Sequence, residues 1–105
     1  MSKIYLIECV RDYDTVYKIG YTKSNSNKRA EQLQTGNDGQ IRVIREFNTI
    51  NGMSVERSLH RLFSHKNINK EWFKLDLNDV QNFIPLCETI ENNLNVLKES
   101  SENIF

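Results

Sequence analysis

Two apolar segments near the start of the chain are joined by only five residues, and this spacing restricts the fold more than any other feature. Residues 3–10 and 16–22 are rich in aliphatic and aromatic side chains, which is typical of strands. The linking residues 11–15 include two aspartates, whose side chains hydrogen-bond to nearby backbone in turns. With so short a connection, the two strands are predicted to form an antiparallel hairpin.

A helix and a third strand are predicted after the hairpin. Serine and asparagine residues before residue 28 favour the start of a helix over Lys28–Thr35, with Gly36 just past its end. Residues 41–47 then have the composition of a strand, in which Arg45 interrupts the apolar alternation. Its apolar side chains are expected on one face: Ile41, Val43 and Phe47.

The second half of the chain is predicted to be mostly helical. The helix expected over Gly52–His65 carries one apolar stripe, which comprises Val55, Leu59, Leu62 and Phe63. A short strand is expected over residues 71–75. Residues 77–98 follow a helical pattern, which Pro85 is expected to break near Ile84 because proline lacks the backbone N–H.

Length and composition indicate one small globular domain. The chain has 105 residues, of which 38% are hydrophobic and 27% charged, so wholesale disorder is excluded. We expect an α/β, or α+β, fold with a small central mixed sheet of three to four strands and helices packed on its faces. The domain is predicted to cover residues 1–98, followed by a frayed tail over residues 99–105.

The sequence also restricts where such a protein works. Its apolar runs are too short to cross a membrane, and its first residues lack the apolar core of a signal peptide. The two cysteines, Cys9 and Cys87, are too few for a disulfide scaffold and lack metal-site spacing. We therefore expect a cytoplasmic protein with two half-buried thiols and no membrane partner.

The formal net charge of zero conceals an asymmetry along the chain. Residues 1–74 carry 13 of the 14 lysines and arginines against 8 acidic residues, whereas residues 75–105 carry one lysine against 6. A basic body with an acidic tail fits a phosphate backbone on one face. A solvated surface of mixed charge would give the same counts, so charge alone does not decide the function.

Several chemistries are excluded because their motifs are absent from the sequence: a glycine-rich phosphate loop, a nucleophile elbow and a paired-histidine zinc helix. What remains is a set of candidate site residues on the hairpin and on two helices: Tyr5, Tyr17, Lys18, Gly20, Arg29, Glu56 and His60. Each of them alone is an ordinary core or surface residue. Only their order along the chain predicts a function.

That order resembles the GIY-YIG endonuclease superfamily, and most closely a branch found in phage, viral and mobile-element proteins. The first motif corresponds to residues 3–5, Lys-Ile-Tyr, and the second to residues 18–20, Lys-Ile-Gly. Arg29 stands where the family has its helix arginine, and Glu56 where it has its metal-binding glutamate. Residues 71–73, Glu-Trp-Phe, match a later motif of the branch, which supports the fold, and we assign Trp72 and Phe73 to the core.

The resemblance implies a metal-dependent DNA endonuclease whose site residues lie on one concave surface. It implies that Glu56 holds one Mg²⁺ or Mn²⁺, that Arg29 binds the phosphate, and that Tyr5 orients or deprotonates the attacking water. Lys18 is expected to lower the pKa of Tyr5. His60 is expected to donate a hydrogen bond to the substrate or to assist Tyr5. The expected nucleic-acid contacts are Lys23, Lys28, Arg29, Arg57 and Arg61. DNA is the expected partner, with RNA as the alternative.

Two other functions fit the same sequence. Leu33 stands where the family often has a histidine, and the family's late asparagine has no clear counterpart, which favours a nucleic-acid-binding module with weakened catalysis. The acidic C-terminal helix also suits an inhibitory or structural partner protein. A chain of this length has no room for a separate recognition domain, so we expect specificity to come from this domain, a homodimer or a partner chain.

Overall fold

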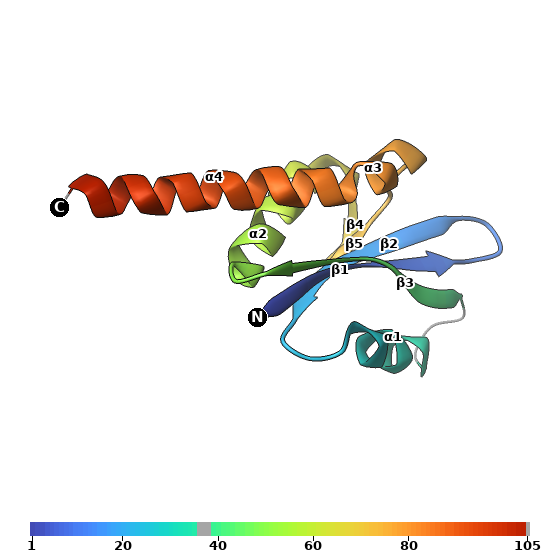
Figure 1. Ribbon diagram of the computed structural model, residues 1–105. Helices are drawn as coiled ribbons and strands as arrows, with labels where there is room; N and C mark the ends of the chain where they lie inside the picture. Colours follow the sequence, from blue (N-terminus) through green and yellow to red (C-terminus); the bar gives the residue numbers. More distant parts are fainter. Residues whose placement is uncertain (36–38, 105) are drawn as a thin grey trace.

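The computed structural model is a five-stranded antiparallel sheet with helices on both faces (Figure 1). It describes residues 1–35 and 39–104. The elements in chain order are β1 (Ser2–Val10), β2 (Thr15–Thr22), α1 (Ser26–Thr35), β3 (Gln40–Thr49), α2 (Gly52–Leu62), the 3₁₀ turn η1 (Ser64–Lys66), β4 (Asn67–Asn69), β5 (Trp72–Phe73), α3 (Leu77–Gln81) and α4 (Phe83–Ile104). The strand order is β3-β1-β2-β5-β4.

The α+β class is confirmed, but the expected sheet differs in two respects. It has five strands instead of three to four, because β4 and β5 form a small second hairpin where the sequence predicts a single strand. Every pairing found in the described part of the chain is antiparallel, so the mixed sheet is wrong. The turn expected around Gly36 lies outside the described residues.

The predicted N-terminal hairpin is confirmed. β1 and β2 pair over eight residues each, from Lys3 opposite Thr22 to Val10 opposite Thr15. The turn is closed by the Arg11 N–H, which donates to the Asp14 carbonyl at 2.8 Å. The Arg11 guanidinium also donates twice to the Asp14 carboxylate, at 2.6 Å in each case. The aspartate therefore fixes the turn that the sequence predicts.

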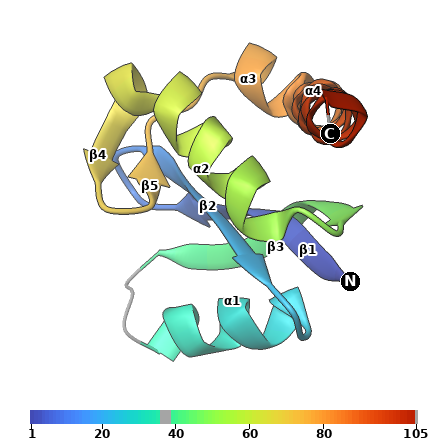
Figure 2. The same cartoon turned by 90° about the vertical axis from the view of Figure 1, so that its left-hand side faces the viewer.

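The sheet has a hydrophobic core on each face. Ile4 and Leu6 of β1 belong to a large cluster packed under α2, α3 and α4, whereas Tyr5 and Ile7 belong to a small cluster with Ala30 of α1. Figure 2 shows α1 on one side of the sheet and the other helices on the opposite side. Because β1 is covered on both faces, it reads as a continuous apolar run.

A β-bulge divides the apolar residues of β3 between the two faces. Leu6 pairs with Arg45 but Ile7 pairs with Val43, so Ile44 is an extra residue in β3. One inserted residue moves the following side chains to the other face of the sheet. Val43 therefore packs on the α1 side and Phe47 on the α2 side, and the single apolar face expected for this strand is wrong.

The C-terminal region contains two helices, separated at Asn82. Asp76 caps α3 through a reciprocal capping box with Asp79. Pro85 lies in the first turn of α4, where the helix needs no N–H from it, and the break expected near Ile84 falls at Asn82, two residues earlier. Figure 1 shows α4 reaching well beyond the sheet, and its backbone stays helical to Ile104, past the boundary expected at residue 98.

Both cysteines lie in the interior of the protein. Cys9 and Cys87 are both buried and neither is disulfide-bonded. Burial raises the pKa of the Cys87 thiol to about 12, with the charges of Glu88 and Glu91 acting in the same direction. Among the described residues, no helix is both long enough and apolar enough to span a bilayer.

Candidate functional site

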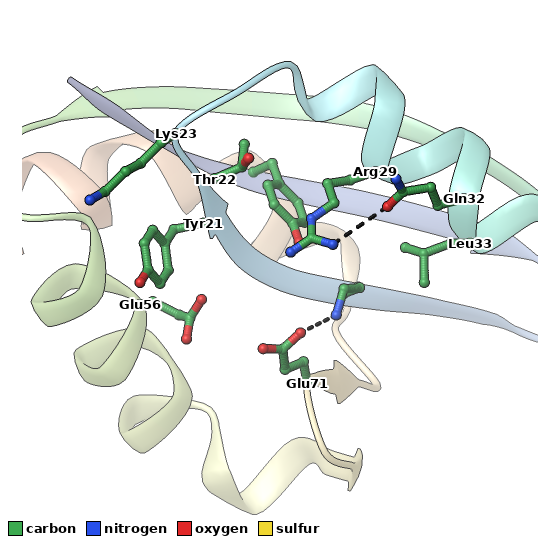
Figure 3. Close-up of a pocket in the computed structure, with 10 residues that line it drawn as sticks. Tyr21, Thr22, Lys23, Arg29, Gln32, Leu33, Glu56 and Glu71 are labelled. Atoms are coloured by element: carbon green, nitrogen blue, oxygen red, sulfur yellow. Dashed lines mark hydrogen bonds and ion pairs between the residues drawn. The ribbon is translucent and has the colours of Figure 1, made fainter.

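A pocket of about 550 Å³ lies beside the second half of β2. Its lining combines three cationic side chains with two carboxylates and is drawn in Figure 3: Tyr5, Lys18, Tyr21, Thr22, Lys23, Arg29, Gln32, Leu33, Glu56 and Glu71. Four residues predicted to share one concave surface are in this set, namely Tyr5, Lys18, Arg29 and Glu56. Their convergence is confirmed, while their catalytic roles stay predictions.

The pocket forms at the edge of β2, where helices from opposite faces of the sheet meet. β5 pairs with Tyr17 and Lys18, and the Ile19 N–H donates to the Glu71 carbonyl at 3.1 Å. Within the described residues, strand pairing on this edge ends there. Beyond it, Arg29 reaches the edge from α1 and Glu56 reaches it from α2 (Figure 3).

Tyr5 lies across the backbone of Gly20, its partner on the neighbouring strand. The two residues are directly opposite each other in the β1–β2 pair. A methyl group placed on Gly20 would lie 2.4 Å from the Tyr5 hydroxyl oxygen and 2.5 Å from Cζ, which is closer than any van der Waals contact. The glycine of the second motif is therefore required because the tyrosine of the first motif covers it.

Lys18 forms an ion pair with Glu71 inside the pocket. Glu71 sits in the tight turn between β4 and β5, next to Lys70, whose φ of 51° is in the left-handed region. The Asn67 amide donates to the Lys70 carbonyl at 2.7 Å and holds this turn. The turn thus brings an acidic side chain to the lysine, of which only 14% is exposed.

The pKa of Tyr5 moves in the direction opposite to the one expected. Burial raises it to about 12; the charges of Glu71 and Glu56 also raise it, whereas that of Arg29 lowers it. The expectation that Lys18 lowers this pKa is wrong, because the ammonium group is paired with Glu71. At neutral pH, Tyr5 is therefore a neutral hydroxyl group.

Removing the charge of Glu71 should bring the pKa of Tyr5 down from about 12. In Glu71→Gln the carboxylate that raises this pKa is gone, although burial still keeps the value above the ordinary 10.0. The raised pKa of Glu56 should fall as well, because Glu71 also contributes to it. Both values can be followed by NMR titration of the metal-free protein, with Tyr5→Phe to assign the tyrosine signal.

Glu46→Gln is the matched control for this titration. Glu46 lies opposite Tyr5 on β3, but its carboxylate pairs with Lys3 at 3.3 Å. The control should leave both pKa values where they are in the wild type. Glu71→Gln with an unchanged Tyr5 titration would contradict the charge coupling across the pocket.

Glu56 is the half-buried carboxylate on the α2 side of the pocket. Burial raises its pKa, and so does the charge of Glu71; His60, a backbone hydrogen bond from Tyr21 and Lys18 oppose this shift. In the described part of the chain, Glu56 makes no ion pair. Its ionised form therefore has no ion-pair partner among the described residues, although the charges of His60 and Lys18 act on it, and a bound cation would stabilise it further.

His60 lies one turn after Glu56 but does not line the pocket. Its Nε2 is 2.8 Å from the Ile19 carbonyl oxygen, and because a carbonyl only accepts, this nitrogen is the donor. The ring packs against Phe73, with centroids 5.1 Å apart. The structure therefore places His60 in the packing of α2 against β2, where it satisfies a backbone group at the end of the β5 pairing.

The predicted nucleic-acid contacts divide into two groups. Lys23 and Arg29 line the pocket, and the Arg29 guanidinium is 3.5 Å from the Gln32 side-chain oxygen. Three other cations are exposed on α1 and α2 without lining the pocket: Lys28, Arg57 and Arg61. The pocket itself thus needs only part of the basic set.

Comparison with known protein families agrees with this arrangement. The model of the T5orf172 domain matches residues 2–88, which include both strands of the hairpin, both helices at the pocket and all the lining residues. The chain belongs to the T5orf172 family. This is a phage-associated domain of a nuclease-like group. No curated protein and no solved structure matches the chain significantly.

Two charged or aromatic residues of this T5orf172 pocket escape prediction from sequence. Glu71 is part of a motif that we interpret as support for the fold and not for chemistry, yet its side chain reaches the pocket because Trp72 pairs with Lys18. Tyr21 packs partly against the large core cluster and still lines the pocket, which is open to both faces of β2. The pairing of β5 with β2 locates Glu71 at the pocket, and no local sequence signal predicts this pairing.

The T5orf172 pocket offers few protein ligands for a metal ion. Among the described residues, no group of three or more His, Cys, Asp or Glu side chains is arranged to hold a metal ion. Mg²⁺ is commonly bound through one or two carboxylates, with waters and substrate phosphate oxygens completing the shell. The half-buried Glu56 carboxylate fits such a sparse site, and Glu71 is the other carboxylate in the same pocket.

Proposed function

We propose that this T5orf172 domain is an endonuclease of GIY-YIG type that hydrolyses phosphodiester bonds in DNA and uses Mg²⁺ or Mn²⁺. One observation carries the proposal: four separate elements bring Tyr5, Lys18, Arg29 and Glu56 into one pocket. Family membership supports it, because the T5orf172 domain is nuclease-like.

Arg29 is the residue we assign to the scissile phosphate. Its guanidinium presents parallel N–H groups that match two non-bridging oxygens, and it is exposed at the rim of the pocket. Lys23 adds a second positive charge to the lining of the same pocket. Together they attract the phosphate into a pocket that also contains two carboxylates.

Tyr5 is proposed to orient the attacking water. Because its hydroxyl group is neutral at neutral pH, it accepts a hydrogen bond from the water and directs the water oxygen toward phosphorus. The new phosphorus–oxygen bond forms as the bond to the leaving oxygen breaks; the attacking water loses its proton to bulk solvent, and the leaving oxygen takes up a proton from solvent. Lys18, held in the same pocket by Glu71, adds positive charge near the developing negative charge.

Glu56 is the proposed metal ligand, with Glu71 beside it. When a divalent cation is bound there, it supplies a Lewis acid that stabilises charge on the phosphate and on the leaving oxygen. Glu56 would be favoured for this role because its ionised form is half-buried without an ion pair. A bound cation would also reduce the repulsion between the two carboxylates.

The proposal is tested by incubating the protein with supercoiled, linear and branched DNA, and with RNA, in Mg²⁺, Mn²⁺ or EDTA. We expect nicked or linear DNA products with either cation and intact DNA in EDTA. If no substrate is cleaved with either Mg²⁺ or Mn²⁺, the proposal is contradicted. Cleavage of RNA alone would change the substrate while leaving the chemistry in place.

Arg29→Lys should lower the rate of cleavage by about 100-fold, because lysine keeps the charge but loses the bidentate geometry. DNA binding should stay close to that of the wild type. Single-turnover cleavage measured beside equilibrium binding separates the two effects. Arg42→Lys is the matched control, since Arg42 is an exposed arginine on β3 outside the pocket, and it should change neither quantity.

A nucleic-acid-binding module without efficient catalysis is the second candidate. It is favoured by the pairing of Lys18 with Glu71 and by the raised pKa of Tyr5, since neither arrangement activates a water molecule by itself. Such a protein would bind DNA with a strong dependence on salt, because phosphate contacts release counterions, but would leave it intact. The cleavage assay above separates the two candidates.

A further inference from the structure

A second cavity of about 270 Å³ adjoins the pocket at the end of β2. It lies against the start of α2 and the residues just before it. Tyr21 and Lys23 line both cavities, so the two are neighbours across these side chains. Figure 3 shows the Lys23 side chain extending away from Arg29, past the ring of Tyr21. A strand bound at Arg29 can therefore continue toward Lys23.

The chemistry of the second cavity differs from that of the first. Two large apolar side chains are exposed there: Ile50, which is 72% exposed, and Met53, which is 49% exposed. Lys23 is a cation at the same cavity, and none of the described residues that line it is acidic. An exposed apolar surface beside one cation suits a nucleotide, whose base has an apolar face and whose phosphate is an anion.

The walls of this cavity are held by packing. A methyl group on Gly52 would lie 2.8 Å from Cβ of Ser2 and 3.0 Å from the Tyr21 ring, so the first turn of α2 presses closely on both. The Asn51 side chain is bonded to α4, where its amide donates to Asn95 at 3.3 Å and its oxygen accepts from Lys98. The surface is therefore formed before any ligand binds.

We propose that this second cavity binds the nucleotide next to the cleaved phosphodiester bond, and that this nucleotide is unpaired. Lys23 binds its phosphate, and its base lies over Ile50 and Met53. The inference rests on the proposed function and adds a substrate class, namely DNA with unpaired nucleotides at the cleavage site. In a continuous duplex, neighbouring bases stack on each face of a base, so side chains reach such a face only after unstacking.

The test measures binding of labelled DNAs to the full chain in EDTA, with cleavage in Mg²⁺ measured in parallel. The wild type should bind a DNA with an internal unpaired stretch more tightly than the fully paired duplex. Ile50→Ser and Met53→Ser should each weaken binding of the unpaired DNA by about 10-fold and leave duplex binding unchanged. Lys23→Gln should weaken both and reduce the salt slope by about one.

Leu62→Ser is the matched control. Leu62 is 51% exposed on the same helix as Met53 and lines neither cavity, so its replacement should leave both affinities unchanged. Melting curves confirm that the compared variants are folded. Equal affinity of the wild type for both DNAs, or wild-type affinity of the Ile50 and Met53 variants for unpaired DNA, would overturn the subsite. Cleavage by the wild type would still support the proposed function in that case.

Discussion

Glu56→Gln is expected to reduce DNA cleavage by at least about 100-fold. The substitution keeps the shape of the side chain and an oxygen that accepts from the Tyr21 backbone, but it removes the charge that would bind a divalent cation. DNA affinity in EDTA should stay close to that of the wild type. Single-turnover cleavage at saturating Mg²⁺ is the measurement, and an unchanged rate would rule out Glu56 as the metal ligand.

Loss of activity should not be accompanied by loss of stability. The pKa of Glu56 is raised in the folded protein, so its contribution to stability is present at low pH and is lost as pH rises through the folded pKa. Without metal at pH 7, Glu56→Gln should therefore melt no lower than the wild type. Mg²⁺ should raise the melting temperature of the wild type and leave that of the variant unchanged. Glu88→Gln, which replaces an exposed carboxylate on α4, is the control and should melt like the wild type with and without Mg²⁺.

Gly20→Ala is expected to destabilise the fold by about 2–3 kcal/mol and to abolish cleavage. The new methyl group would enter the space of the Tyr5 ring, which is only 2% exposed and has little room to move. Urea denaturation gives the free energy of unfolding, and the cleavage assay reports on the pocket. A variant with wild-type stability would contradict the close packing of the two motifs.

A double-mutant cycle with Tyr5→Leu isolates this contact. Leucine lacks the ring atoms that the new methyl group would meet, so Gly20→Ala should be nearly neutral when it is added to Tyr5→Leu. The coupling free energy of the pair should then approach the full cost of Gly20→Ala alone. Additive effects of the two substitutions would mean that the loss has a source other than the tyrosine.

Local sequence signals predict the hairpin and the order of most elements. The short connection with Asp14 leaves few arrangements for the first two strands. Val55 and Leu59 of the predicted stripe mark the buried face of α2, whereas Leu62 is exposed. The convergence of Arg29 and Glu56 follows from the resemblance to a nuclease family, since nothing local links two residues on opposite faces of a sheet.

Features that depend on strand register escape the same reasoning. The bulge at Ile44 moves Phe47 to the other face, but a run of apolar residues looks the same with or without an inserted residue. The pairing of β5 with β2 spans more than 50 residues of sequence and rests on only two register positions. For this reason the partner of Lys18 could be found only in three dimensions, as could the burial that raises the pKa of Tyr5.

The two halves of the pocket are anchored by cores of very different size. Glu56 is on α2, which packs into the large cluster, whereas Arg29 is on α1, which is held by a cluster of three buried residues. Local opening needs less free energy where fewer apolar contacts are lost. Partial unfolding should therefore release α1 first, and amide hydrogens in this helix should exchange faster than those in α2. Arg29, the proposed phosphate ligand, would then detach while the carboxylate side of the pocket stays intact.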